Sequence, residues 1–345
     1  MNLDFASDNW SGVTVAVQEA LLRANVGTQP AYGDDTLTER VTRRFCEVFE
    51  REVAVLLVPT GTAANLLCLQ ATARPAGYVL CSDEAHLLAD EYNGPEFFTG
   101  MKLVPVPTAD GRITPASLEE SLAAMLPPDQ RGPLATLSLT NATEYGTTYS
   151  AAEIGELAAI GKRHGAAIHV DGARFANSVA ATGDSPADLT WRAGVDLMSF
   201  GGTKNGCWMA EAVVVFDPTA YPELPVLRQR AGHGLSKQRF IAAQYDAYLA
   251  DDAWLASASH ANAMAARLAE GLRRHEGIRF GWPPTSNELF PVLPTAVAAR
   301  LREGGVRCLT WRHEGDAEML RLVTSFATTE ADVDALLGLL GLPTP

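Results

Sequence analysis

Lysine is scarce in this chain, and one of its lysines stands in a glycine-rich segment. The 345 residues contain Lys102, Lys162, Lys204 and Lys237, and Lys204 lies within residues 199–207, whose sequence is SFGGTKNGC. A lysine held in a polar pocket with a lowered pKa is a good nucleophile toward a carbonyl, with which it forms a Schiff base. The segment is not a Walker A loop, because asparagine follows the lysine. The alternative is an exposed loop lysine without a chemical role.

A second polar cluster ends an apolar run at residues 169–174, HVDGAR. His169 and Asp171 share one face of the predicted strand. An acid at the carboxyl end of a strand lies where α/β sheets bind ligands, and it could accept a hydrogen bond from a protonated ring nitrogen. Arg174 could bind a carboxylate bidentately. The alternatives are a structural Asp–Arg pair, or a metal site for which no third ligand stands nearby in the sequence.

A third segment, residues 59–65, PTGTAAN, follows an apolar run and opens a predicted helix. A helix N-terminus presents free N–H groups and a partial positive charge, which together bind phosphate. Gly61 lets the backbone approach a ligand closely, and Thr62 adds a hydroxyl group. The segment lacks the third glycine of a dinucleotide-binding fingerprint. The alternative is a tight turn with an ordinary helix cap.

The order of these three segments is more informative than any one of them. An anion site, a strand-end aspartate and a loop lysine are the three attachments that pyridoxal phosphate (PLP) requires, for its phosphate, its ring nitrogen and its aldehyde. His86 follows a further apolar run, where its imidazole could stack on the cofactor ring. A capping or surface histidine is the alternative for His86.

The elements that must position these segments are seven short apolar runs separated by helical stretches. Several runs are apolar on both faces, as parallel strands between two helix layers must be. Helices are predicted at residues 63–73 and 151–163. The alternation predicts an α/β fold around a mostly parallel sheet. The seven predicted strands are residues 53–58, 78–81, 103–106, 134–139, 166–170, 195–200 and 212–216.

The two ends of the chain differ from this central pattern. The first 35 residues resemble an arm with one helical stretch at 13–24, and a long helical region is predicted over 236–276. A shorter α+β tail follows, in which Thr329 begins a capping box. The tail is predicted as strand 289–293, helix 296–303, strands 307–311 and 319–325, and helix 331–340. We predict an arm over 1–15, a large domain over 16–250, and a connecting helix with a small C-terminal domain over 251–345.

Composition restricts the class of protein. The formal charge is −14, which argues against nucleic acid or an anionic membrane as partner. Hydrophobic residues make up 47% and charged residues 20%, which excludes general disorder. We expect no transmembrane helix and no signal peptide, because no long apolar run or apolar leader is visible. Five scattered cysteines are typical of reduced thiols, and we expect a cytoplasmic location.

Taken in order, the motifs resemble those of the low-specificity L-threonine aldolases, which are fold type I PLP-dependent enzymes related to aspartate aminotransferase. The resemblance covers essentially the whole chain and is greatest to the bacterial L-threonine and L-phenylserine aldolase branch. The motifs that carry it are residues 7–9, 31–35, 59–65, the His86 segment, 169–174, 200–206 and 321–324.

The resemblance implies a role for each matching position and a shared active site in a dimer of dimers. Lys204 would bind PLP covalently. The implied cofactor-binding residues are Gly61, Thr62, Asn65, His86, Asp171, Thr203, Lys204 and, from a stretch that does not align clearly, Arg228. The implied substrate-binding residues are Ser7, Tyr32, Arg174 and Arg321.

The base that receives the β-hydroxyl proton stays open at this point. Many family members carry histidine two residues before the glycine that corresponds to Gly146, where this chain has Glu144. His86 and Asp90 are spaced i, i+4, so one helical turn would place them on one face. Asp90 could instead be a solvated helix acid, and Glu91 a structural partner. The candidate catalytic residues are therefore Lys204, His86, Asp90 and Glu144.

The expected activity is cleavage of the Cα–Cβ bond of L-threonine, L-allo-threonine or L-phenylserine, which releases glycine and an aldehyde. A β-eliminating lyase or an aminotransferase on the same fold is the alternative enzyme. A PLP-binding regulatory protein without turnover is the alternative from another class.

Overall fold

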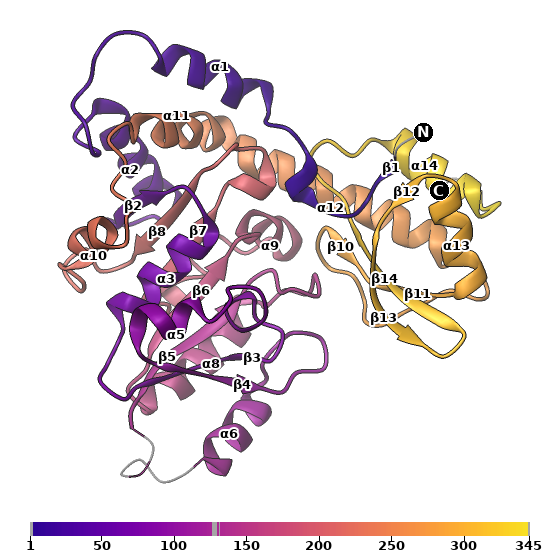
Figure 1. Ribbon diagram of the computed structural model, residues 1–345, viewed down its shortest axis with the longest axis horizontal. Coiled ribbons are helices and arrows are strands. Elements are labelled where there is room, and N and C mark those ends of the chain that lie inside the picture. Colours follow the sequence, from indigo (N-terminus) through magenta and orange to yellow (C-terminus); the bar gives the residue numbers. More distant parts are fainter. Residues whose placement is uncertain (1–2, 126–129, 131, 344–345) are drawn as a thin grey trace.

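A seven-stranded sheet forms the centre of the protein, which we describe from a computed structural model covering all but residues 1–2, 126–129, 131 and 344–345 (Figure 1). The strand order is β2-β8-β7-β6-β5-β3-β4. β8 runs antiparallel to its neighbours β2 and β7, and all other pairs in this sheet are parallel. The strands are β2 (Ala54–Val58), β3 (Tyr78–Ser82), β4 (Lys102–Val106), β5 (Leu134–Thr140), β6 (Ala167–Gly172), β7 (Leu197–Gly201) and β8 (Glu211–Val215). The predicted α/β fold is confirmed, and each predicted run overlaps one strand.

Helices connect these strands and cover both faces of the sheet. The predicted helix 151–163 is confirmed as α8 (Ala151–Arg163), where Ser150 and Glu153 form a capping box. The predicted helix 63–73 is α3 (Gly61–Ala71), which begins two residues earlier because the side chain of Thr60 caps it. The other helices of this body are α2 (Thr36–Val48), α4 (His86–Ala89), α5 (Gly94–Thr99), α6 (Pro115–Ala124), α9 (Phe175–Thr182) and α10 (Leu224–Arg230).

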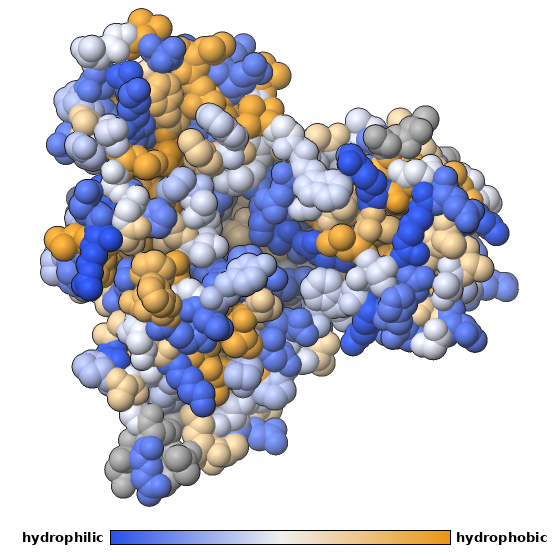
Figure 2. All heavy atoms as spheres, viewed as in Figure 1, coloured by the Kyte–Doolittle hydropathy of each residue, from blue (hydrophilic) through white to orange (hydrophobic). Residues whose placement is uncertain are grey.

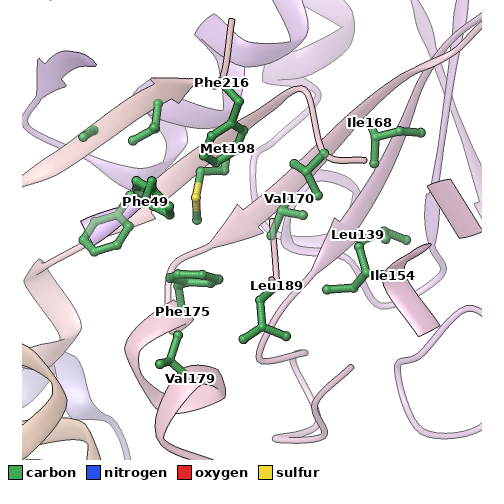
Figure 3. Packing of buried hydrophobic residues seen from close by; sticks show 14 of the residues in the cluster. Phe49, Leu139, Ile154, Ile168, Val170, Phe175, Val179, Leu189, Met198 and Phe216 are labelled. Atoms are coloured by element: carbon green, nitrogen blue, oxygen red, sulfur yellow. The ribbon is translucent and has the colours of Figure 1, made fainter. Parts of the chain in front are cut away.

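The main hydrophobic core lies between the sheet and the helices. Figure 3 shows Val170 of β6 and Met198 of β7 on the sheet, with Phe175 and Val179 of α9 packed below them. Phe49 closes this layer and meets the ring of Phe216 edge to face, with centroids 5.1 Å apart. Strands buried in this way on both sides need no polar face, which explains why their sequences are mostly apolar.

The N-terminal segment lies against elements far away in the sequence. β1 (Leu3–Asp4) pairs in parallel with β12 (Val306–Arg307), and the short helix η1 (Asp8–Trp10) follows. The predicted helical stretch 13–24 is α1 (Val15–Ala24), which packs against α11 (Arg239–Tyr248). The start of the chain therefore contacts the C-terminal part through β1 and the large body through α1.

The long helical region predicted over 236–276 is present, but it is divided into separate helices. α11 is followed by η4 (Ala250–Asp252) and then α12 (Ala253–Leu272). Asp251 and Asp252 have positive φ angles of 50° and 54°, which no α-helix accommodates. Trp254 near the start of α12 packs in the main core, whereas Leu268 near its end packs in a second core. α12 thus joins the two bodies seen in Figure 1.

The C-terminal part is a five-stranded antiparallel sheet with two helices. Its order is β10-β14-β11-β9, and β13 also pairs with β14. Predicted strand 289–293 is divided into β10 and β11, and 307–311 into β12 and β13. Helix α14 (Glu330–Leu339) has the predicted capping box of Thr329 and Asp332. The remaining elements are β9 (Arg279–Phe280), β10 (Glu288–Leu289), β11 (Pro291–Pro294), α13 (Thr295–Glu303), β13 (Leu309–Glu314) and β14 (Ala317–Val323).

The two separate cores support the predicted arm, large domain and small domain, whose boundaries stay a prediction. Within the described part of the chain, no helix is long and apolar enough to cross a membrane.

Candidate active site

A cavity of about 230 Å³ opens at the carboxyl ends of the parallel strands. This edge is where doubly wound sheets bind ligands, because the loops that follow the strands meet there. The structure brings nine of the predicted site residues into its wall. These are Gly61, Thr62, Asn65, His86, Glu144, Asp171, Arg174, Thr203 and Lys204.

The start of α3 forms one end of the cavity. The hydroxyl of Thr60 accepts a hydrogen bond from the backbone N–H of Ala63 at 3.2 Å and so begins the helix. The N–H groups of Gly61 and Thr62 precede the first intrahelical bond and have no carbonyl partner within the helix. A helix start with free N–H groups beside a small residue binds an anion well.

Asp171 stands near the end of β6 with both carboxylate oxygens engaged. Oδ2 accepts from Nδ2 of Asn65 at 2.8 Å, and Oδ1 accepts from the backbone N–H of Ala173 at 3.0 Å. Burial opposes ionisation, but the charge of His86 and these hydrogen bonds lower the pKa of Asp171 overall. A fixed carboxylate here can hold a proton on a ring nitrogen.

His169 does not join this site, although the sequence places it on the same strand. It is fully buried, and its Nδ1 lies 2.9 Å from the hydroxyl of Ser138. Among the residues that the structure describes, no three His, Cys, Asp or Glu side chains converge as a metal site.

Lys204 lies in the short helical turn η3 (Thr203–Asn205) after β7. Asn205 anchors the turn by donating from Nδ2 to the hydroxyl of Tyr248 and to the carbonyl of Trp254, both at 2.8 Å. Gly206 ends it with a φ of 111°, a conformation that favours glycine. Burial, followed by the charge of Arg174, lowers the pKa of Lys204. A lysine amine made less basic in this way is better suited to attack a carbonyl.

His86 begins the one-turn helix α4 and is held by Glu91. Its Nδ1 lies 2.9 Å from Oε1 of Glu91, which also accepts from Nδ2 of Asn65 at 3.0 Å. The hydrogen bond with Glu91 raises the pKa of His86. Asp90 is exposed and does not line the cavity, because α4 ends at Ala89 before a second turn can form.

Glu144 enters the cavity from the loop after β5. Its Oε1 accepts from the backbone N–H of His86 at 2.8 Å and from the hydroxyl of Thr140 at 3.1 Å. Its Oε2 is buried and has no hydrogen-bond partner among the described residues. Burial, together with the charge of Asp171, raises the pKa of Glu144 to about 7.

The two arginines predicted to bind a substrate carboxylate are already held by carboxylates. Arg174 donates to both oxygens of Asp8, at 2.7 and 3.0 Å, and its Nη1 lies 3.3 Å from Glu288. Arg321 donates from Nε to the same Glu288 at 2.9 Å. Burial opposes ionisation of Asp8, but Arg174 lowers its pKa overall. Arg321 therefore lies behind Arg174, one side chain from the cavity wall.

Three other predicted residues lie elsewhere. Ser7 caps η1 by accepting from the backbone N–H of Asn9 at 3.2 Å and lines a separate hollow beside Trp10. Tyr32 and Arg228 line a second surface hollow, where Nη2 of Arg228 lies 3.5 Å from the carbonyl of Tyr32. The structure of this single chain does not bring them to Lys204.

Several residues of this region were not expected from the sequence, including Asp8, which pairs with Arg174. Asn9 and Glu211 line the cavity, and Glu288 joins the two arginines. Glu211 had a readable signal, because it is a single acid placed directly before the wholly apolar run 212–216. Glu288 had none, since its arginines are brought to it only by the fold.

The residues present fit PLP. The wall combines an anion-binding helix start, an ionised strand-end carboxylate and a lysine of lowered pKa. It also contains buried polar atoms without a described partner, namely Oδ1 of Asn65 and Oε2 of Glu144. Such atoms are costly when left unpaired, so they favour a polar ligand in this space.

Comparison with known proteins gives a consistent result. Residues 4–291 match the beta-eliminating lyase family. The low specificity L-threonine aldolase of Pseudomonas aeruginosa is 40% identical over 92% of this chain and 91% of its own length. That of a Pseudomonas sp. is 37% identical over 96% of this chain and 95% of its own length. The solved threonine aldolase of Leishmania major superposes with a TM-score of 0.92 at 27% identity, covering 98% of both chains.

Proposed function

Since the chain belongs to the family of low-specificity L-threonine aldolases, which are PLP-dependent lyases, we propose that the cavity at Lys204 cleaves L-threonine to glycine and an aldehyde. We extend the proposal to L-allo-threonine and L-phenylserine. The observation that carries it is the convergence of Lys204, Asp171, His86 and the start of α3 in one cavity wall.

The residues of the cavity wall support the following cofactor-binding roles. The N–H groups at Gly61 and Thr62 would bind the phosphate, and Lys204 would hold the aldehyde carbon. Asp171 would keep a proton on the ring nitrogen, and His86 would contact the ring. When bound, PLP supplies an electron sink for the bond between Cα and Cβ.

The arginine side of the cavity binds and orients the substrate. Arg174 presents a guanidinium that is fixed by Asp8 and backed by Glu288 and Arg321. A substrate carboxylate that contacts this group is held at a defined angle. The orientation of the bound substrate would then determine which bond at Cα breaks.

Glu144 is our choice for the base that takes the proton from the β-hydroxyl group. Glu144 lines the cavity, its buried Oε2 has no partner among the described residues, and its pKa of about 7 suits proton transfer near neutrality. His86 is a poorer base, because Glu91 raises its pKa and favours the protonated ring. Asp90 is the weakest candidate, because it is exposed and lies outside the cavity wall.

The active site is completed by a second copy of the chain in this proposal. Tyr32 and Arg228 form a polar surface away from Lys204, where they are available to a partner. Large apolar side chains are also exposed, including Val15 and Leu22 of α1, and apolar atoms gather where α1 and α11 lie (Figure 2). Exposed apolar surface of this kind favours association. We propose a dimer of dimers, located in the cytoplasm.

The test identifies both the lysine that carries PLP and the products of the reaction. Borohydride reduction of the PLP-loaded protein, followed by peptide mapping, should find the cofactor on Lys204 and no adduct in Lys204→Ala. Incubation with L-threonine, L-allo-threonine and L-phenylserine should give glycine with acetaldehyde or benzaldehyde. Ammonia with a keto acid would indicate β-elimination, amine transfer would indicate an aminotransferase, and an adduct without turnover would indicate a binding protein.

A further inference from the structure

Glu211 is a buried acid at the phosphate end of the cavity that the proposed reaction does not use. It is the first residue of β8, and its register partners are Val58 at the end of β2 and Gly201 at the end of β7. Because side chains alternate along a strand, Glu211 shares the face of Val213, which packs against α3. The strand therefore directs this carboxyl toward the start of α3.

The contacts agree with that direction. Oε1 of Glu211 accepts from the backbone N–H of Thr203 at 3.3 Å, and the residue is 5% exposed. A Cβ atom placed on Gly61 would lie 3.8 Å from Oε2 of Glu211. Glu211, Gly61 and Thr62 line the same cavity.

The charges around Glu211 do not neutralise it by contact. It forms no ion pair with any residue that the structure describes, although Lys204 stands nearby and favours its ionised form. Asp171 opposes ionisation, and α3 contributes no charged side chain. The other titratable neighbours are Cys207 and, from α11, Tyr245 and Tyr248.

A carboxylate beside a phosphate site is repulsive, whereas a carboxylic acid is a hydrogen-bond donor. Burial, the largest cause, raises the pKa of Glu211 to about 7, so that this carboxyl takes up a proton readily near neutral pH. An anionic phosphate then has a donor from β8 in addition to the N–H groups of α3.

We propose that Glu211 binds the cofactor phosphate as a neutral carboxylic acid, donating a hydrogen bond to a phosphate oxygen, and that cofactor binding therefore retains or takes up one proton at this residue. The proposal rests on the proposed function in one respect, because it places the PLP phosphate at the start of α3.

The test measures PLP affinity of the cofactor-free protein against pH, without any activity assay. Glu211→Gln keeps the size and an N–H donor but does not titrate. The ratio of wild-type to Glu211→Gln dissociation constants cancels the titration of PLP itself and of Lys204. It should lie near one at about pH 6 and rise about tenfold for each pH unit above the pKa of about 7.

Two controls tie the effect to the phosphate. With pyridoxal, which lacks the phosphate, the same ratio should not change with pH. Glu144→Gln, which alters a buried carboxyl of similar pKa elsewhere in the cavity, should give a flat ratio with PLP. A rising ratio with pyridoxal would overturn the proposal, because the effect would then act through the aldehyde or the ring.

Two further outcomes also contradict the proposal. A flat ratio with PLP would mean that Glu211 does not exchange a proton on binding. Weaker binding by Glu211→Gln at every pH would mean that an ionised Glu211 pairs with a cation. Failure of the wild-type protein to attach PLP at Lys204 would instead overturn the proposed function, and this inference with it.

A measurement on the wild-type protein is independent of how the variant folds. Infrared difference spectra taken on adding PLP at about pH 8, where Glu211 is mostly ionised in the free protein, should gain a protonated-carboxyl band. The absence of that band would overturn the proposal.

Discussion

Two sides of one cavity hold buried carboxyl groups in opposite ways. On the arginine side, Asp8 and Glu288 contact guanidinium groups at hydrogen-bond or ion-pair distance. On the strand-edge side, Glu144 and Glu211 contact N–H and hydroxyl donors but no described cation. The pKa of Asp8 is lowered, whereas those of Glu144 and Glu211 rise to about 7.

The comparison shows that a buried carboxyl can serve two functions, depending on whether a guanidinium contacts it. Burial alone disfavours a charged carboxyl, and a guanidinium in contact reverses this preference. The arginine side therefore has permanent charges, which suit recognition of a substrate carboxylate. The other side has carboxyls that gain and lose protons near neutral pH, which suits proton transfer and reversible donation.

The largest expected effect comes from removing Arg174 on the arginine side, because its guanidinium contacts both Asp8 and Glu288. Arg174→Ala leaves Asp8 and Glu288 buried with one guanidinium fewer, and we expect it to lower the free energy of unfolding by about 3–5 kcal/mol. Urea denaturation of the cofactor-free protein measures this. Arg192→Ala removes an exposed arginine that contacts Glu50 and should leave unfolding nearly unchanged. Equal losses in the two variants would contradict the comparison.

Next in size is the loss of the proposed base. Glu144→Gln should lower kcat for L-threonine by about a hundredfold or more, because the amide cannot accept the β-hydroxyl proton. In the wild-type enzyme kcat/KM should rise with pH through about 7, as Glu144 loses its proton. Kinetics across this pH range test both statements. A Glu144→Gln variant with nearly normal kcat would exclude Glu144 as the base.

A smaller effect concerns how Glu211, on the strand-edge side, changes the free energy of unfolding with pH. The raised pKa of Glu211 means that the folded state holds its proton where the unfolded chain, with a pKa near 4.5, has lost it. The cofactor-free wild type should therefore lose stability as pH rises from about 4.5 to about 7. Glu211→Gln avoids this loss and should be more stable by up to about 3 kcal/mol at pH 8. Urea denaturation at low and high pH checks this, and an identical difference at both would contradict it.

The smallest expected effect is a change in the pKa of His86, which Glu91 contacts. Glu91→Gln weakens the hydrogen bond that favours protonated His86, so the pKa of His86 should fall toward its ordinary value of 6.5. NMR titration of the histidine resonances measures the change, with the exposed His313 as an internal reference. An unchanged His86 titration would show that Glu91 does not control its protonation.

The central fold was readable from the sequence because its strands are buried on both faces. The run 212–216 is apolar throughout and 134–139 is interrupted only by Thr136 and Ser138, and β8 and β5 form there. The C-terminal strands were placed less well, since partners distant in the sequence divide residues 289–293 between two strands. The break at Asp251 and Asp252 was also missed, because aspartate within a helical pattern does not by itself indicate a positive φ.

The site was readable where one segment carries its own chemistry, as at Lys204 and Asp171. It was not readable where a role depends on contact in space. Spacing favoured Asp90 beside His86, but α4 ends after one turn, and the imidazole contacts Glu91, which was expected only as a structural partner. Glu288 acquires its position only when β10 lies beside β14, which carries Arg321.

Helix α12 also sets the distance between the two bodies of the protein, which carry Lys204 and Arg321 respectively. Its twenty residues span about 30 Å, with Trp254 set in one core and Leu272 in the other. Lys204 is fastened to the first body through the bond from Asn205 to the carbonyl of Trp254, whereas Arg321 travels with the second. The distance between the Lys204 amine and the Arg321 guanidinium behind Arg174 thus depends on the length and straightness of α12, and shortening or bending this helix would change the support of Arg174 without altering any residue that lines the cavity.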